Sequence, residues 1–599
     1  MFTYDKPDNL VEMFELSLAR NAERPLFGTA DQNGTYSWAS YREIGKRIDN
    51  LRAGLAQQGI TAGDAVGIIA NNRTEWAVAA FATFGLGGRF IPMYEKELPK
   101  IWKHIIKDSS LKILFVANES IYNAIKEIRD EVPELEQLFI IDGPTGLTMK
   151  DLEQQGQKIP LKVIVPKPTD TAVLIYTSGT TGDPKGVLLS HGNFTSNVIA
   201  GGKIFPEFNH EDRSLSILPW AHSYGQTAEL YNFIYFGGSM GFIRDVTTIV
   251  QDMKNVAPTF LVAVPRVFNK IYDGIWGKMN ETGGLALKLF TMGLESAASQ
   301  RDSASQGKTL LLAKLKYAIA DRIVFKKIRQ GFGGHLSAAL TASAMMNQEV
   351  AQFFMDIGLP IYDAYGLSET SPAVTMNCRN ANKPGSVGRP LDKVRVVIDR
   401  EHMEDDESGA GEIVVYGPNV MQGYHNKPEA TKAVMTDEGG FRTGDLGFID
   451  DDGFLFITGR IKEQYKLENG KYVFPASLEE EIQISPWVEN VFVYGEGRRY
   501  NICIIVPDFF KLSAWAAKKG LDAKTHAELV ALPETESMIR ESITAQLKGK
   551  FGGYEIPRQF VLVAEPFSVD NGMLTHTMKL KRGKVLDRYK DYVDLAYEK

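Results

Sequence analysis

The stretch AVGIIANNRTEWAVAAFATFGLGGRFIPM, residues 65–93, predicts the class of fold. It begins with the apolar run 65–70 and ends with the apolar run 90–93, and the sequence between them has a helix-like composition. Further apolar runs follow at 113–116 and 138–141, again separated by a helix-like stretch. Strands that alternate with helices favour a largely parallel sheet covered by helices. The sequence therefore predicts an α/β fold.

The length of the chain indicates more than one domain, because its 599 residues greatly exceed the roughly 150 of a typical domain. Apolar residues make up 44% and charged residues 24% of the sequence, which is typical of a soluble globular protein. This composition excludes a mainly disordered, collagen-like or coiled-coil protein. The net charge of −7 provides no strongly basic field, so we expect no nucleic-acid partner.

The cysteines and the start of the chain bear on its location. Cys378 and Cys503 are too few for a disulfide framework or a cysteine-rich metal site, and they are compatible with a reducing compartment. The first residues, MFTYDKPDNL, have neither the basic nor the apolar region of a signal peptide. No uncharged apolar run approaches the about 18 residues of a membrane span. We therefore expect a cytoplasmic protein without a spanning anchor.

A change of sequence texture divides the chain. Between residues 394 and 457 short strand-like runs alternate with Gly and Asp turns, which predicts a small antiparallel β subdomain at about residues 386–459. After Arg460 the pattern resets to one helix candidate and three strand candidates. We therefore predict a large N-terminal domain of layered α/β subdomains, residues 1–459, and a small α+β C-terminal domain, residues 460–599.

One segment has the composition of a membrane-binding helix. Residues 301–329 carry eight Lys or Arg against two Asp, with Leu and Ile interleaved. A basic amphipathic helix of this kind can lie on anionic lipid as a peripheral membrane contact. The alternative is a helix that packs its apolar side on its own domain and leaves its charges in solvent. The sequence leaves both interpretations open.

Residues 176–186, YTSGTTGDPKG, give the strongest local signal for a binding site. An apolar run leads into a loop of Gly, Ser and Thr that ends in Pro184, Lys185 and Gly186. Backbone N–H groups exposed by glycine, hydroxyl donors and one lysine are what a loop needs to hold polyphosphate. The loop is not a Walker A motif, because Gly186 and not Ser or Thr follows Lys185, so Mg²⁺ must be held in another way.

This loop resembles the signature loop of the AMP-forming acyl-CoA synthetases, members of the adenylate-forming ligase superfamily. Further motifs follow in the family's order: LPWAHSYG (218–225), YGLSET (365–370), GEIVVYGPNVMQGY (411–424), TGDLG (443–447), GRIKEQYKLENGKYVFP (459–475) and THTMKLKR (575–582). YSWASY (36–41) and PRVFNKIY (265–272) resemble the long-chain fatty acid–CoA ligase branch in particular. The resemblance implies a large adenylation domain followed by a small, mobile C-terminal domain.

The resemblance also implies a reaction. ATP would activate a carboxylic acid, expected to be a medium- or long-chain fatty acid, to an acyl-adenylate with release of pyrophosphate. CoA would then take the acyl group and release AMP, so the cofactors are expected to be ATP, Mg²⁺ and CoA. Two alternatives stay open: a ligase that loads a carrier protein, and a catalytically silent nucleotide- or lipid-binding member of the fold. The chain is expected to be a monomer or a homodimer.

The resemblance places the nucleotide site on several motifs. The phosphates would be held by Thr177, Ser178, Gly179, Thr180, Thr181, Gly182 and Lys185, and the rest of the nucleotide by Ala344, Asp363, Ala364, Tyr365, Gly366 and Ser368. Asp445 and Arg460 are expected at the ribose, whose hydroxyls a carboxylate can accept. Glu369, with Thr177, is expected to bind Mg²⁺, which prefers hard oxygen ligands. His222 is expected beside the substrate carboxylate.

The remaining assignments fall in the C-terminal domain. Lys579 matches the lysine that would stabilise the charge developing between the carboxylate and the α-phosphate, with Lys581 as the alternative. Lys462 matches the hinge at which the C-terminal domain would turn between the two half-reactions. Lys466 and Gly470 are expected beside the pantetheine of CoA, where glycine allows a close backbone approach.

One motif departs from the family's pattern. Residues 341–346, TASAMM, stand where relatives usually have a Ser-Gly-Gly-Ala turn, so Ala342 and Ser343 replace two glycines. The added Cβ atoms would restrict φ and narrow the space beside the adenylate. We therefore predict an altered mouth of the acyl pocket.

Overall fold

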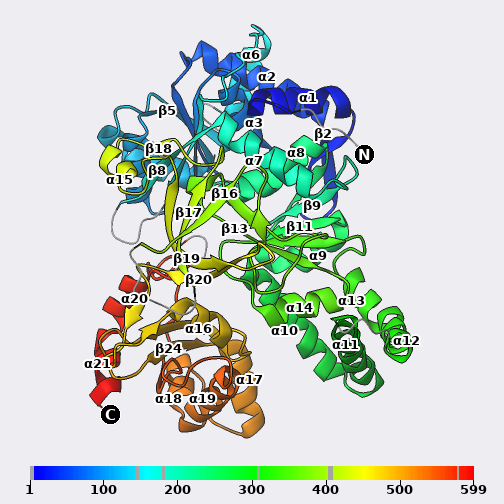
Figure 1. The fold of residues 1–599 in the computed structure, drawn as a ribbon. Helices are drawn as coiled ribbons and strands as arrows, with labels where there is room; N and C mark the ends of the chain where they lie inside the picture. Colours follow the sequence, from blue (N-terminus) through cyan, green and yellow to red (C-terminus); the bar gives the residue numbers. More distant parts are fainter. Residues whose placement is uncertain are drawn as a thin grey trace. The chain divides into compact units, whose positions relative to one another are not determined.

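The apolar runs of the N-terminal region pair side by side in a seven-stranded sheet of the computed structural model (Figure 1). In the order β18-β8-β7-β4-β3-β5-β6, the strands from β7 to β6 run parallel, and β8 pairs antiparallel with β7 and with β18. The strands are β3 (Ala65–Ile69), β4 (Arg89–Met93), β5 (Leu111–Asn118), β6 (Gln137–Asp142), β7 (Thr171–Thr177), β8 (Lys185–Ser190) and β18 (Gly423–Tyr424). The predicted α/β fold is confirmed.

The structure describes residues 6–143, 148–177, 183–305, 310–401, 409–575 and 579–598. The chain divides into two compact units. Unit 1 contains Met1–Val397, Val414–Thr443 and Asp450–Leu455, and unit 2 contains Ile398–Ile413, Gly444–Ile449 and Phe456–Lys599. The predicted domain boundary between residues 459 and 460 stays a prediction.

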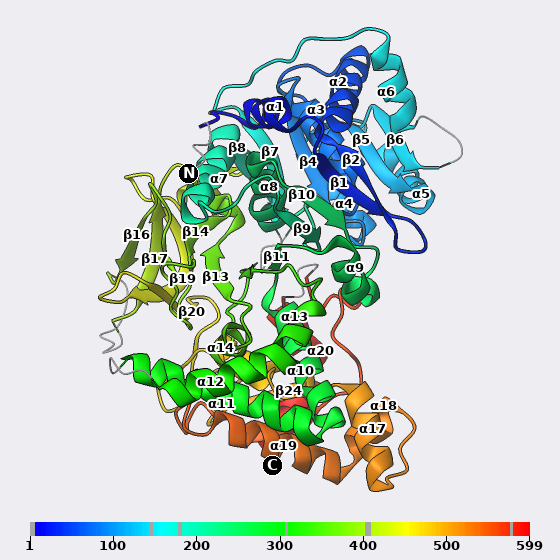
Figure 2. The ribbon, with the colours of Figure 1, turned by 90° about the vertical axis from the view of Figure 1, so that its right-hand side faces the viewer.

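Crossover helices cover both faces of the seven-stranded sheet. α3 (Thr74–Phe84) connects β3 to β4, whereas α4 (Pro99–Asp108) and α5 (Glu119–Glu127) connect strands in the opposite direction along the sheet. Because crossovers between parallel strands are right-handed, the two directions place α3 on one face and α4 and α5 on the other. On the α3 face, α2 (Tyr41–Gln57) packs closely against α6 (Met149–Gln157) (Figure 2).

Two further sheets complete the strands of unit 1 that surround the site. Their orders are β2-β1-β10-β9 and β11-β12-β13-β14-β15. The strands are β1 (Pro25–Ala30), β2 (Tyr36–Ser40), β9 (Arg213–Ser216), β10 (Ser239–Phe242), β11 (Phe260–Ala263), β12 (Ala338–Thr341), β13 (Ile361–Gly366), β14 (Ala373–Met376) and β15 (Arg389–Pro390). Because β12 and β13 are parallel neighbours, their carboxyl ends meet at one edge of the sheet, which places the segments that follow them side by side.

Further helices belong to this part of unit 1. They are α1 (Leu10–Asn21), α7 (His191–Ile204), α8 (Asn232–Phe236), α9 (Ile249–Val256), α10 (Pro265–Thr282), α14 (Gln348–Asp356) and α15 (Pro428–Lys432). A π-helix, Gly225–Tyr231, runs directly into α8. Within the described residues, no helix is long and apolar enough to cross a bilayer.

Residues 301–329 do not form one amphipathic helix, contrary to the interpretation from the sequence. α11 (Gly284–Ser305) is followed by α12 (Leu311–Ala320), a π-helix (Asp321–Phe325) and α13 (Lys326–Gln330). α12 lies alongside α11 (Figure 2). A Cβ atom at Gly293 of α11 would come within 2.6 Å of the Ala320 side chain, so this glycine permits the close approach of the segments. The structure therefore divides the segment that the charge pattern suggested was continuous.

The predicted β-rich segment and the C-terminal region also contain the expected elements. A four-stranded sheet has the order β16-β17-β19-β20, formed by Arg395–Asp399, Gly411–Tyr416, Phe441–Ile449 and Leu455–Arg460. Unit 2 adds the hairpin β21 (Tyr465–Lys466) and β22 (Tyr472–Val473), and a sheet of β23 (Val488–Tyr494), β24 (Ile502–Pro507) and β25 (Gln559–Leu562). Its helices are α16 (Pro475–Ile482), α17 (Phe509–Lys519), α18 (His526–Ala531), α19 (Pro533–Leu547), α20 (Arg582–Arg588) and α21 (Lys590–Glu598).

Candidate active site

The predicted phosphate loop lies at the turn between β7 and β8. Thr177 at the end of β7 pairs with Lys185 at the start of β8. Ser178, Gly179, Thr180, Thr181 and Gly182 lie outside the described residues. Both arms of this hairpin are fixed from outside: Tyr176 Oη donates to Asp108 Oδ2 over 2.7 Å, and His104 Nε2 lies 3.0 Å from the Pro184 carbonyl oxygen. The two strands that flank the predicted loop are therefore held in place by neighbouring residues.

Tyr424 connects Glu369 to this hairpin. Glu369 follows β13 in a short 3₁₀ helix, Ser368–Thr370, and its Oε1 accepts a 2.9 Å hydrogen bond from the hydroxyl of Tyr424 on β18. The Nζ of Lys185 lies 5.0 Å from the centroid of the Tyr424 ring. Burial, and secondly the charge of Glu369, raise the pKa of Tyr424, so its hydroxyl stays a donor. The structure thus brings together the predicted Lys185 and Glu369.

Sequence reasoning missed Tyr424 as a site residue. The tyrosine ends the motif at residues 411–424, so the sequence contained the signal. Its partner Glu369 lies 55 positions earlier in the chain. The motif did not indicate that contact, because only the pairing of β18 with β8 brings Tyr424 beside the phosphate-loop hairpin.

The donor set at Glu369 fits Mg²⁺ held mainly by substrate. No group of three or more His, Cys, Asp or Glu side chains suited to a metal occurs in the part of the chain that the structure describes. Mg²⁺ that binds phosphate oxygens and water needs only one or two protein ligands, and a carboxylate is the preferred one. Glu369 has this chemistry, and its pairing with Thr177 as a second ligand stays a prediction.

The carboxyl ends of β12 and β13 carry the predicted nucleotide residues 344, 363–366 and 368. Asp363 pairs with Thr341, and its Oδ2 accepts a 3.2 Å hydrogen bond from the backbone N–H of Met346. The other oxygen, Oδ1, has no hydrogen-bond partner among the described residues. Burial raises the pKa of Asp363 to about 8, against the lowering effect of the N–H groups of Met346 and Ala364. At neutral pH the carboxyl is therefore mostly protonated and can donate a hydrogen bond.

The other predicted residues of this edge differ in exposure. Ala344 is exposed in the turn after β12, and Tyr365 is half-buried at the end of β13. Ser368 is buried, with its Oγ 3.2 Å from the Oγ of Ser223. This contact links the YGLSET motif to the motif that contains His222. Contact of Ala344, Tyr365 and Ser368 with a nucleotide stays a prediction.

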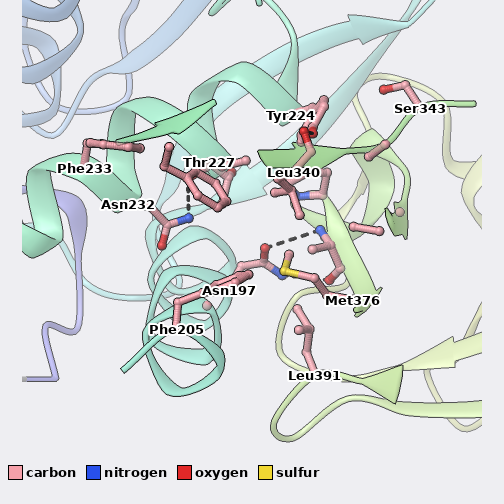
Figure 3. Close-up of a pocket in the computed structure, with 18 of the residues that line it drawn as sticks. Asn197, Phe205, Tyr224, Thr227, Asn232, Phe233, Leu340, Ser343, Met376 and Leu391 are labelled. Carbon is pink, nitrogen blue, oxygen red and sulfur yellow. Dashed lines mark hydrogen bonds between the residues drawn. The ribbon is translucent and has the colours of Figure 1, made fainter. Parts of the chain in front are cut away.

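An apolar pocket adjoins this edge of the sheet (Figure 3). The empty space in and around it, open solvent included, is about 760 Å³. Its apolar walls include Phe205, Phe208, Phe233, Phe236, Phe260, Leu340, Leu367, Met376 and Leu391. The predicted residues His222, Ala364 and Gly366 line the same pocket. This lining suits an apolar chain that ends beside the polar motifs.

His222 is held by its own turn. Its Nδ1 accepts a 3.1 Å hydrogen bond from the backbone N–H of Tyr224, and the Tyr224 hydroxyl donates to the carbonyl of Leu340 over 3.1 Å. The turn therefore connects the histidine to β12. These contacts fix His222 at the pocket, and its contact with a substrate carboxylate stays a prediction.

Ser343, at a position where relatives usually have glycine, has a backbone conformation typical of glycine. Ser343 has a φ of 77°, a left-handed conformation that glycine adopts freely and serine at a cost. Ser343 and Ala342 both line the pocket. The backbone of the turn is thus glycine-like although the side chains are not. The predicted narrowing of the pocket mouth stays a prediction.

A polar side chain interrupts the apolar lining. Asn232 follows the π-helix, and its Nδ2 donates to the carbonyl of Thr227 over 2.7 Å (Figure 3). This bond fixes the orientation of the amide, because a flipped amide would set two oxygens against each other. Asn232 Oδ1 is left without a hydrogen-bond partner among the described residues. Sequence analysis gave no indication of this acceptor, since the π-helix that positions it was not predicted.

In unit 2 the two predicted ribose residues are in contact. Arg460 Nε donates to Asp445 Oδ1 over 2.6 Å, and the carboxylate is buried while the guanidinium remains half-exposed. Lys462 is exposed in the turn after β20. The ion pair fixes the carboxylate in an orientation from which it can accept hydroxyl groups. The roles of these residues at a ribose and at a hinge stay predictions.

The predicted CoA and adenylation residues of unit 2 lie on turns. Lys466 on β21 has its Nζ 4.5 Å from the centroid of the Tyr472 ring, and Gly470 in the same hairpin has a φ of 80°. No atom lies within 4 Å of the position a Cβ of Gly470 would take, so its backbone is accessible. The backbone N–H of Lys579 donates to Thr575 Oγ1 over 3.0 Å, and Lys579 and Lys581 are both exposed.

The chain matches known protein families over most of its length. The family model described as AMP-binding enzyme matches residues 14–425, and the model described as AMP-binding enzyme C-terminal domain matches residues 462–599. A protein of Arabidopsis thaliana named long chain acyl-CoA synthetase 6, peroxisomal, is 30% identical over 589 residues, covering 94% of this chain and 82% of the relative. Long-chain-fatty-acid–CoA ligase FadD15 of Mycobacterium bovis is 31% identical over 578 residues, covering 95% of this chain and 93% of the relative.

Solved structures share the fold. The adenylation domain of a carboxylate reductase from Mycobacterium chelonae has a TM-score of 0.80 at 22% identity, covering 99% of this chain and 91% of that one. The anthranilate CoA ligase AuaEII in complex with anthranoyl-AMP has a TM-score of 0.74 at 18% identity, with 99% of each chain covered. At these identities the likeness establishes the fold, as predicted.

Proposed function

Because the chain belongs to the AMP-binding enzymes, as an AMP-forming long-chain acyl-CoA synthetase, we propose roles for its residues in each half of the reaction. The enzyme uses ATP and Mg²⁺ to activate a fatty acid to an acyl-adenylate, with release of pyrophosphate. It then transfers the acyl group to CoA and releases AMP.

The residues of unit 1 prepare the adenylation. A carboxylate must approach the α-phosphate of ATP, so the site has to offset the repulsion between two anions. We assign the phosphates to Thr177, residues 178–182 and Lys185. Glu369, oriented by the hydroxyl of Tyr424, supplies the carboxylate for Mg²⁺. The metal, when bound, neutralises phosphate charge.

The apolar pocket is the observation that carries the assignment of substrate. Its aromatic and aliphatic walls bind the fatty acyl chain, and His222 and Gly366 in the same lining face the carboxylate end. We place adenine at the edge formed by Asp363, Ala364 and Tyr365, with Ala344 and Ser368 nearby. Asp445 and Arg460, paired in unit 2, hold the ribose.

Unit 2 supplies the groups that change between the half-reactions. Lys579 stabilises the charge that develops as the carboxylate attacks phosphorus, and its withdrawal follows rotation at Lys462. Lys466 and the open backbone at Gly470 then bind the pantetheine of CoA. In this proposal residues 1–459 form the adenylation domain and residues 460–599 the mobile domain.

We also propose the setting in which the enzyme works. It acts in the cytoplasm as a monomer or homodimer, and the segment 301–329 contacts a membrane surface. The exposure of apolar side chains on α12 supports the membrane contact.

The test is pyrophosphate release from ATP and Mg²⁺ with a panel of carboxylic acids of different length and shape, each with and without CoA. We expect release that depends on medium- or long-chain fatty acids and thioester in equal amount when CoA is added. Release without thioester would favour a carrier protein as the acyl acceptor. No release with any acid would contradict the proposed activity and favour the catalytically silent alternative.

A further inference from the structure

α12 exposes apolar side chains that a soluble helix would normally bury. The exposed fractions are 79% for Leu311, 65% for Leu312, 60% for Leu315, 42% for Ile319 and 44% for Ile323. Four of these residues, 311, 315, 319 and 323, recur every fourth position along α12 and the π-helix that continues it, and so follow one side of this helical segment. We call the five residues the α12 surface. A contiguous exposed apolar surface of this kind marks an interaction site more often than chance exposure.

The α12 surface is not the packing face of the helix. The opposite side of the segment is already buried against its own unit through Ala313, Ala320, Val324 and Phe325. Phe325 contacts Phe290 of α11, with ring centroids 6.1 Å apart. The helix therefore has one apolar face in the core and a second one that the described part of unit 1 leaves uncovered. The described packing of this segment therefore does not account for the five exposed apolar residues.

Basic side chains surround the α12 surface. Lys314, Lys316, Arg322, Lys326 and Lys327 are all exposed. Residues 310–330 contain six Lys or Arg and one acidic residue, Asp321, which pairs with Arg329 over 2.6 Å. Among the residues that the structure describes, none of the five exposed cations has an ion-pair partner. The segment is strongly positive in a chain whose net charge is −7.

We propose that the α12 surface docks the enzyme on an anionic lipid bilayer. Its leucines and isoleucines would enter the boundary between headgroups and acyl chains, and the five cations would contact lipid phosphates. This inference deepens the peripheral contact in the proposed function by naming the residues and the lipid charge. A fatty acid dissolved in the same bilayer is then close to the enzyme that activates it.

The same charges disfavour a second copy of the chain as the occupant. A two-fold symmetric dimer through the α12 surface would set the same five cations of both copies near one another. Since the described residues of the segment offer no free carboxylate against them, such an interface would be repulsive. An anionic bilayer offers an apolar interior to the leucines and isoleucines and negative charge to the five cations.

The test measures binding of the full-length protein to vesicles. We expect it to co-sediment with phosphatidylcholine vesicles that contain phosphatidylglycerol, and to remain in solution with pure phosphatidylcholine. High salt should weaken the binding, because the Debye length falls from about 10 Å at 0.1 M to about 3 Å at 1 M. The double variant L315E/I319E should lose about tenfold or more in vesicle affinity.

A matched control is available in the same unit. Val246 and Val250 are 77% and 60% exposed, outside the basic segment. V246E/V250E should bind vesicles as the wild type does. All three proteins should release pyrophosphate equally with a medium-chain fatty acid that is supplied in solution without vesicles, which shows that they are folded.

Three results would overturn the docking proposal. They are equal vesicle binding by wild type and L315E/I319E, no binding to anionic vesicles, or a change from dimer to monomer on L315E/I319E substitution, which would identify a second copy as the occupant. Absence of pyrophosphate release from the wild type would instead contradict the proposed activity, whatever the vesicles show.

Discussion

The hydroxyl of Tyr424 donates a 2.9 Å hydrogen bond to Oε1 of Glu369. Because β18 also pairs with β8, the same tyrosine connects Glu369 to the hairpin that carries the phosphate loop, with Lys185 Nζ 5.0 Å from its ring centroid. One side chain therefore sets the orientation of the proposed Mg²⁺ ligand relative to the proposed phosphate-binding lysine.

Tyr424→Phe should remove the hydroxyl that orients Glu369 while keeping the aromatic ring. We expect kcat for pyrophosphate release to fall about 10–100-fold and the Mg²⁺ concentration for half-maximal rate to rise, as is typical when a group that positions a ligand is lost. The measurement is a Mg²⁺ titration of the initial rate. Tyr416→Phe, from the same motif, is the control. An unchanged Mg²⁺ dependence in Tyr424→Phe would refute the positioning role.

Lys579→Ala should separate the two half-reactions. If Lys579 stabilises charge that develops only during adenylation, its loss should slow pyrophosphate release by about 10²-fold or more. A supplied acyl-adenylate should still be converted to thioester at the wild-type rate. Lys581→Ala is the matched control, because Lys581 is equally exposed two positions later. Equal loss of both half-reactions in Lys579→Ala would contradict the assignment.

Ser343→Gly should release backbone strain and widen the pocket mouth. The φ of 77° costs a non-glycine residue about 1–2 kcal/mol, so we expect the melting temperature to rise by about 1–2 °C. Removal of the side chain should also raise kcat/KM for branched acids relative to straight ones. Ser343→Ala keeps the Cβ atom and should show neither effect. A variant Ser343→Gly with unchanged acid preference would contradict the predicted narrowing.

Several features of this site show what sequence can and cannot predict. The α/β alternation followed from local composition, because it depends on residues adjacent in sequence, whereas the grouping of Lys185 with Glu369 followed only from the resemblance to a known family. The Tyr424 contact spans 55 positions, and it depends on strand pairing that no local pattern encodes. The break between α11 and α12 is not marked in the charge pattern, which continues across it. Tertiary contacts therefore decide the parts that the sequence left open.

Asp363→Asn should change the pH dependence of stability. In the unfolded chain an aspartate titrates near about 4, whereas burial raises the pKa of Asp363 to about 8 in the folded protein. Between these values the folded state holds a proton that the unfolded state has lost, so stability falls as the pH rises. The amide cannot ionise and avoids this loss.

Thermal unfolding at a series of pH values measures the effect. The melting temperature of Asp363→Asn should exceed that of the wild type by about 2–4 °C at pH 9, and the difference should shrink towards pH 4. Asp445→Asn is the control, because it breaks the ion pair with Arg460, and that variant should show no gain in melting temperature over the wild type. A difference for Asp363→Asn that is independent of pH would show that the carboxyl ionises normally.

Asn232→Leu should alter substrate preference, because it removes a hydrogen-bond acceptor that has no partner among the described residues from the acyl pocket. The Oδ1 of Asn232 has no partner among the described residues, and a buried polar atom left unpaired costs about 1–3 kcal/mol. An unsubstituted acyl chain cannot donate a hydrogen bond to Asn232 Oδ1. An acyl chain with a hydroxyl group beside that atom can donate one and so offsets the cost. We therefore expect the wild type to prefer a mid-chain hydroxy acid over its parent acid, and Asn232→Leu to reverse the preference by about fivefold or more in kcat/KM.

Asn197→Leu separates this effect from a general change of polarity. Asn197 lines the same pocket, but its Nδ2 donates to the carbonyl of Ala373 over 2.8 Å and its Oδ1 accepts from the Ala373 N–H over 3.3 Å. With both amide groups paired, it has no free acceptor for substrate. Its replacement should lower the melting temperature without changing the ratio of kcat/KM for the two acids. If Asn232→Leu likewise left that ratio unchanged, water and not substrate would be the partner of Asn232.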